Sequence, residues 1–494
     1  MTTELHYLEL LELAESLRQR EISSVEAVSA QLERIARLDP HLASYAWVTS
    51  GEALASAAAA DAEIAAGKYR GPLHGIPIGL KDLFFTKGVR TSGGMAIHRD
   101  FLPGQDATAV GRLREAGAVI LGKLQMTEGA YSDHHPSVVP PKNPWNPAYW
   151  TGISSSGSAT ATAAGLCYGS LASDTGGSIR WPCAATGLTG IKPTWGRVSR
   201  FGTFELAPSL DHVGTIARSA ADAAVLLGAI AGYDPKDPTT RLHEVPNYLS
   251  TEHMGDLRIG IDPRWICEDV DEPVRKVLRN AADAFLDIGA IVVDVTVPDV
   301  KQAIVDWSPA CAVESALAHE ATYPRRREEY GPILAAVLDA GRAIPATEFL
   351  KILRRRMELR GRFSELFMQI DVLLAPAQPF APLSLDTIRT LGAQPELILK
   401  LQRFTAPFDM TGDPTISLPG GFSDTGLPIG IQLAAGHLRE LQLVQAARAF
   451  QKVTHWHRRH PNVQAIIPQY DDCLGPCRGR GCPPSSTFPR SAEK

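Results

Sequence analysis

The sequence lacks a long apolar run. Its most apolar stretch, residues 223–231, is far shorter than the roughly 20 residues that cross a bilayer as a helix. Residues 1–24 alternate apolar and charged side chains at helical spacing, without the apolar stretch and small-residue cleavage site of a secretory signal. We therefore expect no membrane partner and a cytoplasmic location.

A basic stripe is also missing. The chain carries 49 Lys and Arg against 54 Asp and Glu, a net charge of −5. Cations are scattered except in residues 354–362, a cluster whose simplest interpretation is a solvated helix face. Because nucleic-acid binding needs a positive surface, we expect no nucleic acid as a partner.

Cysteine is scarce, with seven in 494 residues. Four lie far apart in apolar surroundings, which predicts reduced, buried thiols: Cys167, Cys183, Cys267 and Cys311. The other three, Cys473, Cys477 and Cys482, have spacings that fit no zinc ribbon or finger. We predict no metal site.

Helices alternate with short apolar strands along the chain. Residues 4–20, 23–38 and 50–66 have helical patterns, and Ser23 or Ser24 can cap the second helix with Glu26 at capping-box distance. Residues 71–85 then switch to short apolar runs cut by Gly and Pro, which is typical of strands and turns.

The order helix, turn, apolar strand recurs in residues 107–124, 274–298 and 360–379. This alternation predicts an α/β fold with a sheet covered by helices on both faces. Residues 469–494 are rich in Gly, Pro, Ser and charge, which predicts a disordered tail. We therefore expect a single large domain over residues 1–468.

The most informative segment is residues 151–197, which is rich in Gly and Ser. A flexible linker would not contain the helix-forming run of residues 159–167. A phosphate loop is disfavoured because Ser158 stands where a Walker motif needs Lys. The residues around Ser178 do not match the nucleophile elbow G-x-S-x-G of α/β-hydrolases.

Three motifs resemble the amidase signature family. They read GISSSGSA from Gly152, DTGGSIRWPC from Asp174 and GIKPT from Gly190, and GIPIGLKD, ending at Asp82, matches the family's upstream Lys element. The resemblance extends over about residues 8–460. Ile153 and Ser156 depart from the pattern, since the family usually has Gly at both positions.

The resemblance implies a catalytic triad, with Ser178 as nucleophile, Ser154 as a relay after a cis peptide bond, and Lys81 as general base. It also implies a twisted, mostly parallel mixed sheet and chemistry without a cofactor. A Ser hydroxyl needs a base, and Lys can serve only when burial or nearby positive charge lowers its pKa. Lys81 lies in an apolar segment that we expect to be buried.

An oxyanion hole is expected just before the nucleophile. The backbone N–H groups of Thr175, Gly176, Gly177 and Ser178 are the donors that the resemblance implies, and the two glycines leave this backbone unobstructed. Asp174 and Arg180 flank the segment with opposite charges. We interpret them as structural residues that orient the turn.

Histidine is the competing base for a Ser nucleophile, and sequence order alone does not exclude it. Five histidines are candidates: His74, His134, His135, His212 and His319. The resemblance places no catalytic His at any of them, and we expect ordinary polar or core roles.

The expected function is a free-standing amidase for small aryl or acyl amides, carbamates or esters, with a mainly apolar pocket. The resemblance implies that Ala130 and Tyr131 contact the acyl group, and the side chains of Met126, Ala130 and Tyr131 offer apolar surface. The alternative is the glutaminase component of a tRNA-dependent amidotransferase, in which Arg356 would bind the carboxylate of glutamine. A third hypothesis is an inactive binding protein on this scaffold, which the intact triad disfavours. The expected partner is a small amide, and a homodimer is left open.

Overall fold

A computed structural model describes residues 4–250 and 257–466 of the chain. In these ranges eleven strands form one sheet in the order β1-β3-β2-β4-β6-β5-β10-β11-β9-β7-β8. The predicted tail, residues 469–494, and its three cysteines lie outside the described residues.

The strands are β1 (Tyr45–Val48), β2 (Pro77–Lys81), β3 (Val119–Leu124), β4 (Gly169–Asp174), β5 (Thr189–Lys192), β6 (His212–Ala217), β7 (Arg258–Ile261), β8 (Ile291–Asp294), β9 (Val372–Pro376), β10 (Thr415–Phe422) and β11 (Pro428–Ala434). The helices are α1 (Leu10–Gln19), α2 (Ser24–Leu42), α3 (Ser50–Ala65), α4 (Thr108–Glu115), α5 (Ser156–Ala163), α6 (Arg180–Thr186), α7 (Ala220–Ile230), α8 (Pro263–Cys267), α9 (Glu272–Asp287), α10 (Lys301–Ala318), α11 (Pro332–Ala343), α12 (Ala346–Leu366), α13 (Leu385–Arg389), α14 (Pro395–Gln402), α15 (Ala406–Thr411) and α16 (Glu440–Val453).

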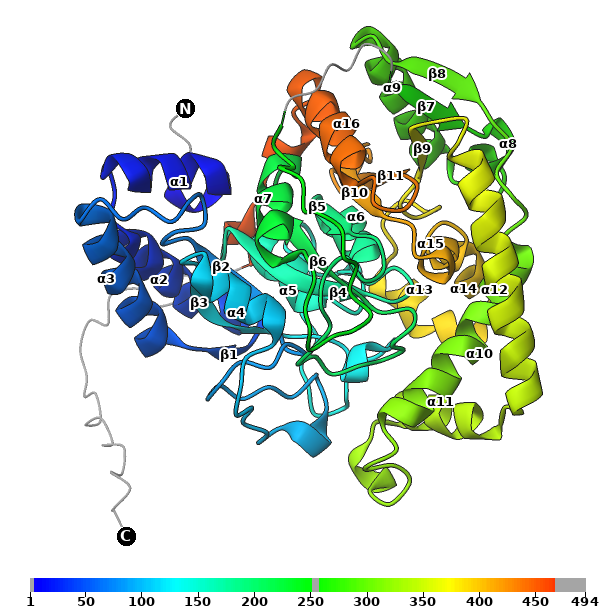
Figure 1. The fold of residues 1–494 in the computed structure, drawn as a ribbon, viewed down its shortest axis with the longest axis horizontal. Coiled ribbons are helices and arrows are strands. Elements are labelled where there is room, and N and C mark those ends of the chain that lie inside the picture. Colours follow the sequence, from blue (N-terminus) through cyan, green and yellow to red (C-terminus); the bar gives the residue numbers. More distant parts are fainter. Residues whose placement is uncertain (1–3, 251–256, 467–494) are drawn as a thin grey trace, which may run out of the picture.

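Helices cover both faces of the sheet, as predicted. Consecutive strand residues point to opposite faces, and Leu171 and Ala172 of β4 belong to different apolar clusters. Leu171 shares its cluster with the buried residues of α7, whereas Ala172 packs with residues of α5 and α6. The central strands therefore lie between two helical layers (Figure 1).

The expectation of a mostly parallel sheet is wrong in its proportions. Of the ten strand pairings within residues 4–250 and 257–466, four are parallel and six antiparallel. Helices separate β2 from β3 and β7 from β8, so these pairs are parallel. No helix lies between β5 and β6 or between β10 and β11, and both pairs are antiparallel.

The predicted N-terminal helices form close to their expected limits. Ser23 caps α2: its hydroxyl accepts from the Glu26 N–H, and the Glu26 carboxylate accepts from the Ser23 N–H at 2.8 Å. This reciprocal pair satisfies two donors that the helix itself leaves free. The capping box read from the sequence is confirmed.

Helices α10, α11 and α12 form an arm at the right of Figure 1, beyond β9 and α15. No helix in the described part of the chain is both long enough and apolar enough to span a membrane. Cys167, Cys183 and Cys311 are buried free thiols, but Cys267 is exposed, because it ends the short helix α8 near the surface.

Candidate active site

Lys81 is the last residue of β2, and its side chain is fully buried. Its Nζ donates to three hydroxyl oxygens, those of Ser154 at 2.6 Å, Ser173 at 2.8 Å and Ser155 at 2.9 Å. Burial lowers the pKa of Lys81 to about 7, although the more distant carboxylates of Asp174 and Asp211 oppose the shift. Burial thus brings the neutral amine within reach near pH 7.

Ser154 reaches Lys81 from a tightly packed turn. Gly152 has φ +78°, and a side chain there would meet the backbone of Pro182 at 2.4 Å, so this turn requires glycine. The Ile153–Ser154 peptide bond is cis. Ile153 packs beside Trp150 and other apolar side chains, so the departure from glycine at this position is accommodated.

Ser178 lies in the loop that joins β4 to α6 and is 8% exposed. Strands β2 and β4 are parallel neighbours, so Lys81 and this loop lie at the same edge of the sheet. A Cβ on Gly176 would lie 2.4 Å from the Trp307 ring, and one on Gly177 would lie 2.5 Å from the Trp181 ring. Among the described residues, Ser178 Oγ has no hydrogen-bond partner.

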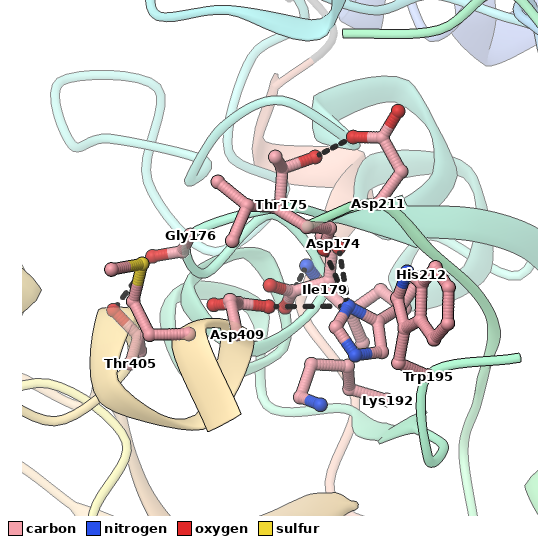
Figure 2. A network of polar contacts seen from close by, with 12 residues as sticks. Asp174, Thr175, Gly176, Ile179, Lys192, Trp195, Asp211, His212, Thr405 and Asp409 are labelled. Atoms are coloured by element: carbon pink, nitrogen blue, oxygen red, sulfur yellow. Dashed lines mark hydrogen bonds and ion pairs between the residues drawn. The ribbon is translucent and has the colours of Figure 1, made fainter. Parts of the chain in front are cut away.

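Asp174 organises this loop, as its predicted structural role requires. Its carboxylate accepts from the N–H groups of Gly177 at 2.7 Å and Ile179 at 2.9 Å, and from Arg180 Nε at 3.0 Å and Nη2 at 2.7 Å. Arg180 Nη2 also donates to Asp409 of α15, at 2.5 Å. The resulting buried network lies beside the loop in Figure 2. Burial disfavours the charge of Asp174, but the Arg180 guanidinium and the backbone donors hold its pKa well below the usual range.

The expected oxyanion hole needs one correction. The Gly177 N–H is bonded to Asp174, so it is not free to face a substrate. The N–H groups of Thr175, Gly176 and Ser178 have no hydrogen-bond partner among the described residues. The hypothesis of four donors is therefore reduced to three.

Two further serines contact Lys81, and the sequence motifs did not point to either of them. Ser155 follows Ser154 directly, and Ser173 lies one residue before the DTGGS motif at the end of β4. The Ser155 hydroxyl donates to the Ser173 carbonyl at 3.2 Å. The triple-serine run was the only local signal for Ser155, and Ser173 became recognisable only through the pairing of β2 with β4.

Of the three residues expected to contact the substrate, two lie at or beside a cavity and one is buried in the core. Ala130 has φ +62° and lines a small cavity that also contains Ser173 and Phe204. Tyr131 is half-buried beside it, and its carbonyl accepts from the hydroxyl of Thr127. Met126 is fully buried in the core and offers no surface to a substrate, so that expectation is wrong.

The five candidate histidines make no hydrogen bond to Ser154 or Ser178 in the described ranges. His134 contacts the hydroxyl of Ser156 at 3.1 Å, and burial lowers the pKa of this His to about 4. His212 is fully buried, and its Nδ1 contacts the Leu210 carbonyl at 2.6 Å. Among the candidate bases in the described residues, Lys81 alone hydrogen-bonds to the hydroxyl of Ser154.

Arg356 on α12 braces the interior of the protein. Its Nη1 contacts the Ser209 hydroxyl at 2.5 Å, its Nη2 the Ser209 carbonyl, and its Nε the Met410 carbonyl. Each of the three nitrogens is thus bonded to a protein oxygen, so most of the five N–H donors of this guanidinium are engaged inside the protein and not with a substrate. No group of three His, Cys, Asp or Glu in the described part of the chain could hold a metal ion.

Comparisons with known proteins agree with these motifs. The Amidase family profile matches residues 26–444. The protein named putative amidase AmiD of Mycobacterium tuberculosis is 49% identical over 458 residues, which cover 92% of this chain and 96% of that protein. A glutamyl-tRNA(Gln) amidotransferase component from Azotobacter vinelandii is 40% identical over 485 residues, which cover 92% of this chain and 99% of that protein.

The fold points the same way. The native peptide amidase from Stenotrophomonas maltophilia aligns with a TM-score of 0.77 at 29% identity, over 92% of this chain and 98% of that structure. The sequence motifs, the profile match over most of the chain and the shared architecture are concordant. This chain is an amide hydrolase that belongs to the amidase family.

Proposed function

We propose that the chain hydrolyses the C–N bond of small carboxylic amides through the triad Lys81, Ser154 and Ser178 and an acyl-enzyme on Ser178. The observation that carries this proposal is the buried contact between Lys81 Nζ and Ser154 Oγ at 2.6 Å. Because no carboxylate lies within hydrogen-bond distance of this amine in the described residues, its neutral form is readily available near pH 7.

The three hydroxyls around Lys81 divide their roles. A neutral amine has two N–H donors and one lone pair, so one of its three hydroxyl partners must donate to it. Ser155 directs its proton to the Ser173 carbonyl and therefore accepts from Lys81. Ser154 and Ser173 remain as candidate donors, and we assign the role to Ser154 because its contact with Lys81 is the shorter, at 2.6 Å against 2.8 Å. In this role Ser154 can in turn take a proton from Ser178.

Acylation follows from this relay. Ser178 Oγ forms a bond to the amide carbon while its proton passes to Ser154 and the Ser154 proton passes to Lys81. The carbonyl electron pair moves to oxygen, where the free N–H groups of Thr175, Gly176 and Ser178 stabilise it. The C–N bond then breaks as the relay returns the proton to the leaving amine. Water attacks the acyl-enzyme by the reverse path and releases the carboxylic acid.

Covalent labelling tests the nucleophile. A fluorophosphonate probe should label the protein at Ser178, and Ser178→Ala should lose both labelling and turnover because the attacking oxygen is gone. Ser423→Ala, in the turn between β10 and β11, is the matched control and should label normally. Substantial labelling of Ser178→Ala would refute the proposal.

The proposed substrates are uncharged aryl or acyl amides rather than free glutamine. Burying the ammonium and carboxylate of glutamine without matched charges is costly, and Arg356 is already bonded to Ser209 and Met410. The glutaminase alternative is favoured by the extensive similarity to glutamyl-tRNA(Gln) amidotransferase components. The deciding measurement is kcat/KM for acetanilide against glutamine with the purified chain alone. A preference for glutamine, or activity only with an added partner protein, would favour the alternative.

A further inference from the structure

Trp307 of α10 contacts the catalytic loop from outside the signature motifs. Its indole N–H donates to the Thr175 carbonyl at 2.7 Å, and its side chain is 8% exposed. We propose that Trp307 is a positioning residue that fixes the direction in which the Gly176 N–H points toward the substrate oxygen. This inference rests on the proposed function of the loop as an oxyanion hole.

The argument begins with peptide geometry. The C=O of Thr175 and the N–H of Gly176 belong to one planar trans peptide and point in opposite directions. A donor that holds the carbonyl on one side therefore directs the N–H to the other side. Since the Gly176 N–H has no partner among the described residues, the Trp307 hydrogen bond is the contact that sets its direction.

The following peptide is held differently. The Gly176 carbonyl accepts from the Thr405 hydroxyl at 2.7 Å, and the Gly177 N–H at the other side of the same plane donates to Asp174. Figure 2 shows the contact between Thr405 and Gly176. This second peptide is fixed at both ends. In the described residues the one hydrogen bond to the peptide group between Thr175 and Gly176 comes from Trp307, while the Thr175 hydroxyl donates to Asp211 at 2.7 Å.

Packing makes the dependence stronger. Glycine has a wide range of accessible backbone angles, so a loop with two glycines does not define its own peptide directions. The Trp307 ring fills the space where a Gly176 side chain would be, 2.4 Å from that Cβ position. Trp307 is itself held in place because the neighbouring Asp306 accepts two hydrogen bonds from Arg355 of α12, each 2.7 Å long.

The test removes the indole N–H and measures transition-state stabilisation. Trp307→Phe should slow fluorophosphonate labelling of Ser178, and weaken inhibition by 2,2,2-trifluoroacetophenone, by about tenfold each, the upper end for one neutral hydrogen bond. Both probes place an oxygen in the proposed hole. With 4-nitroacetanilide, kcat should fall by a similar factor while KM stays close to wild type. A purely structural role would not separate these quantities.

The matched control removes an indole-to-carbonyl hydrogen bond at a site away from the catalytic loop. The Trp145 indole N–H donates to the Thr186 carbonyl at 2.8 Å, at the far end of α6 from Ser178. Trp145→Phe should leave labelling and inhibition unchanged. If Trp307→Phe does not fold, 3-(3-benzothienyl)alanine at position 307 keeps the ring shape and replaces only the N–H with sulfur.

The outcomes separate the two proposals. Labelling and inhibition at wild-type values in either position-307 variant would overturn the role of Trp307 while leaving the nucleophile intact. An equal loss in Trp145→Phe would also overturn it, because the effect would then be one of general stability. Labelling that persists in Ser178→Ala would instead refute the proposed function itself.

Discussion

Two fully buried lysines lie on neighbouring strands of this sheet, and their surroundings differ. Lys81 ends β2 and contacts three hydroxyls, with no carboxylate within hydrogen-bond distance among the described residues. Lys123 lies on β3, where its Nζ is 3.5 Å from the Asp82 carboxylate and donates to the Phe84 carbonyl and the Thr91 hydroxyl. Burial lowers the pKa of Lys123 to about 8, and Asp82 opposes the shift.

The difference shows that burial alone does not define a catalytic base. Lys123 faces a carboxylate and a carbonyl, groups that only accept hydrogen bonds and that stabilise its ammonium form. Lys81 faces hydroxyls, which can donate to a neutral amine as well as accept from an ammonium group. We interpret Lys123 as a structural ion-pair partner and Lys81 as the base.

The largest expected effect is the loss of activity in Lys81→Ala. Because a general base contributes ~10²–10⁴-fold, kcat for an aryl amide should fall by about that factor. Steady-state kinetics on the purified variant provide the measurement, and circular dichroism confirms that it is folded. A fall of less than about tenfold, below that range, would mean that another group removes the Ser178 proton.

Lys123→Met should reverse the pattern by reducing stability and sparing catalysis. Removing one partner of a buried pair leaves Asp82 without its cation, which costs about 3–5 kcal/mol in the free energy of unfolding. Urea denaturation measures this cost, and kcat of the folded protein should remain at the wild-type value. Adding Asp82→Asn should recover part of the stability. A large loss of kcat in folded Lys123→Met would remove the distinction between the two lysines.

The pH profile sharpens the comparison further. In the proposed mechanism the neutral form of Lys81 is the active one, and burial lowers the pKa of this residue to about 7. The value of kcat/KM should therefore rise by about tenfold per pH unit below pH 7 and level off above about pH 8 as the amine becomes fully neutral. A rate that keeps rising to pH 10 would indicate a lysine with an ordinary pKa.

The smallest effect is expected from single hydroxyls. Ser173→Ala removes one of the three partners of Lys81, and a neutral hydrogen bond of this kind should change kcat by about threefold to tenfold. The matched control is Thr91→Val, which removes the hydroxyl beside Lys123 and should leave kcat unchanged. Equal effects in the two variants would show that neither hydroxyl acts through the base.

Local chemistry explains why much of this molecule was predictable from its sequence. The capping box of Ser23 and Glu26, the helix of residues 272–287 and the strand that follows it depend on residues close together in the chain. The motifs also located Lys81, Ser154 and Ser178, and the structure brings Lys81 into contact with Ser154 as those motifs imply.

The tertiary structure decided the features that depend on distant residues. The antiparallel centre of the sheet, the hydroxyl of Ser173 beside Lys81 and the bond from Trp307 to Thr175 each join segments that no local periodicity relates. The sequence by itself determined which side chains we propose to carry the chemistry, because those are encoded in short motifs. Only the fold decided that the Gly177 N–H donates to Asp174 and that the Arg356 guanidinium donates to Ser209. Whether a donor is free to bind a substrate depends on all the groups packed around it.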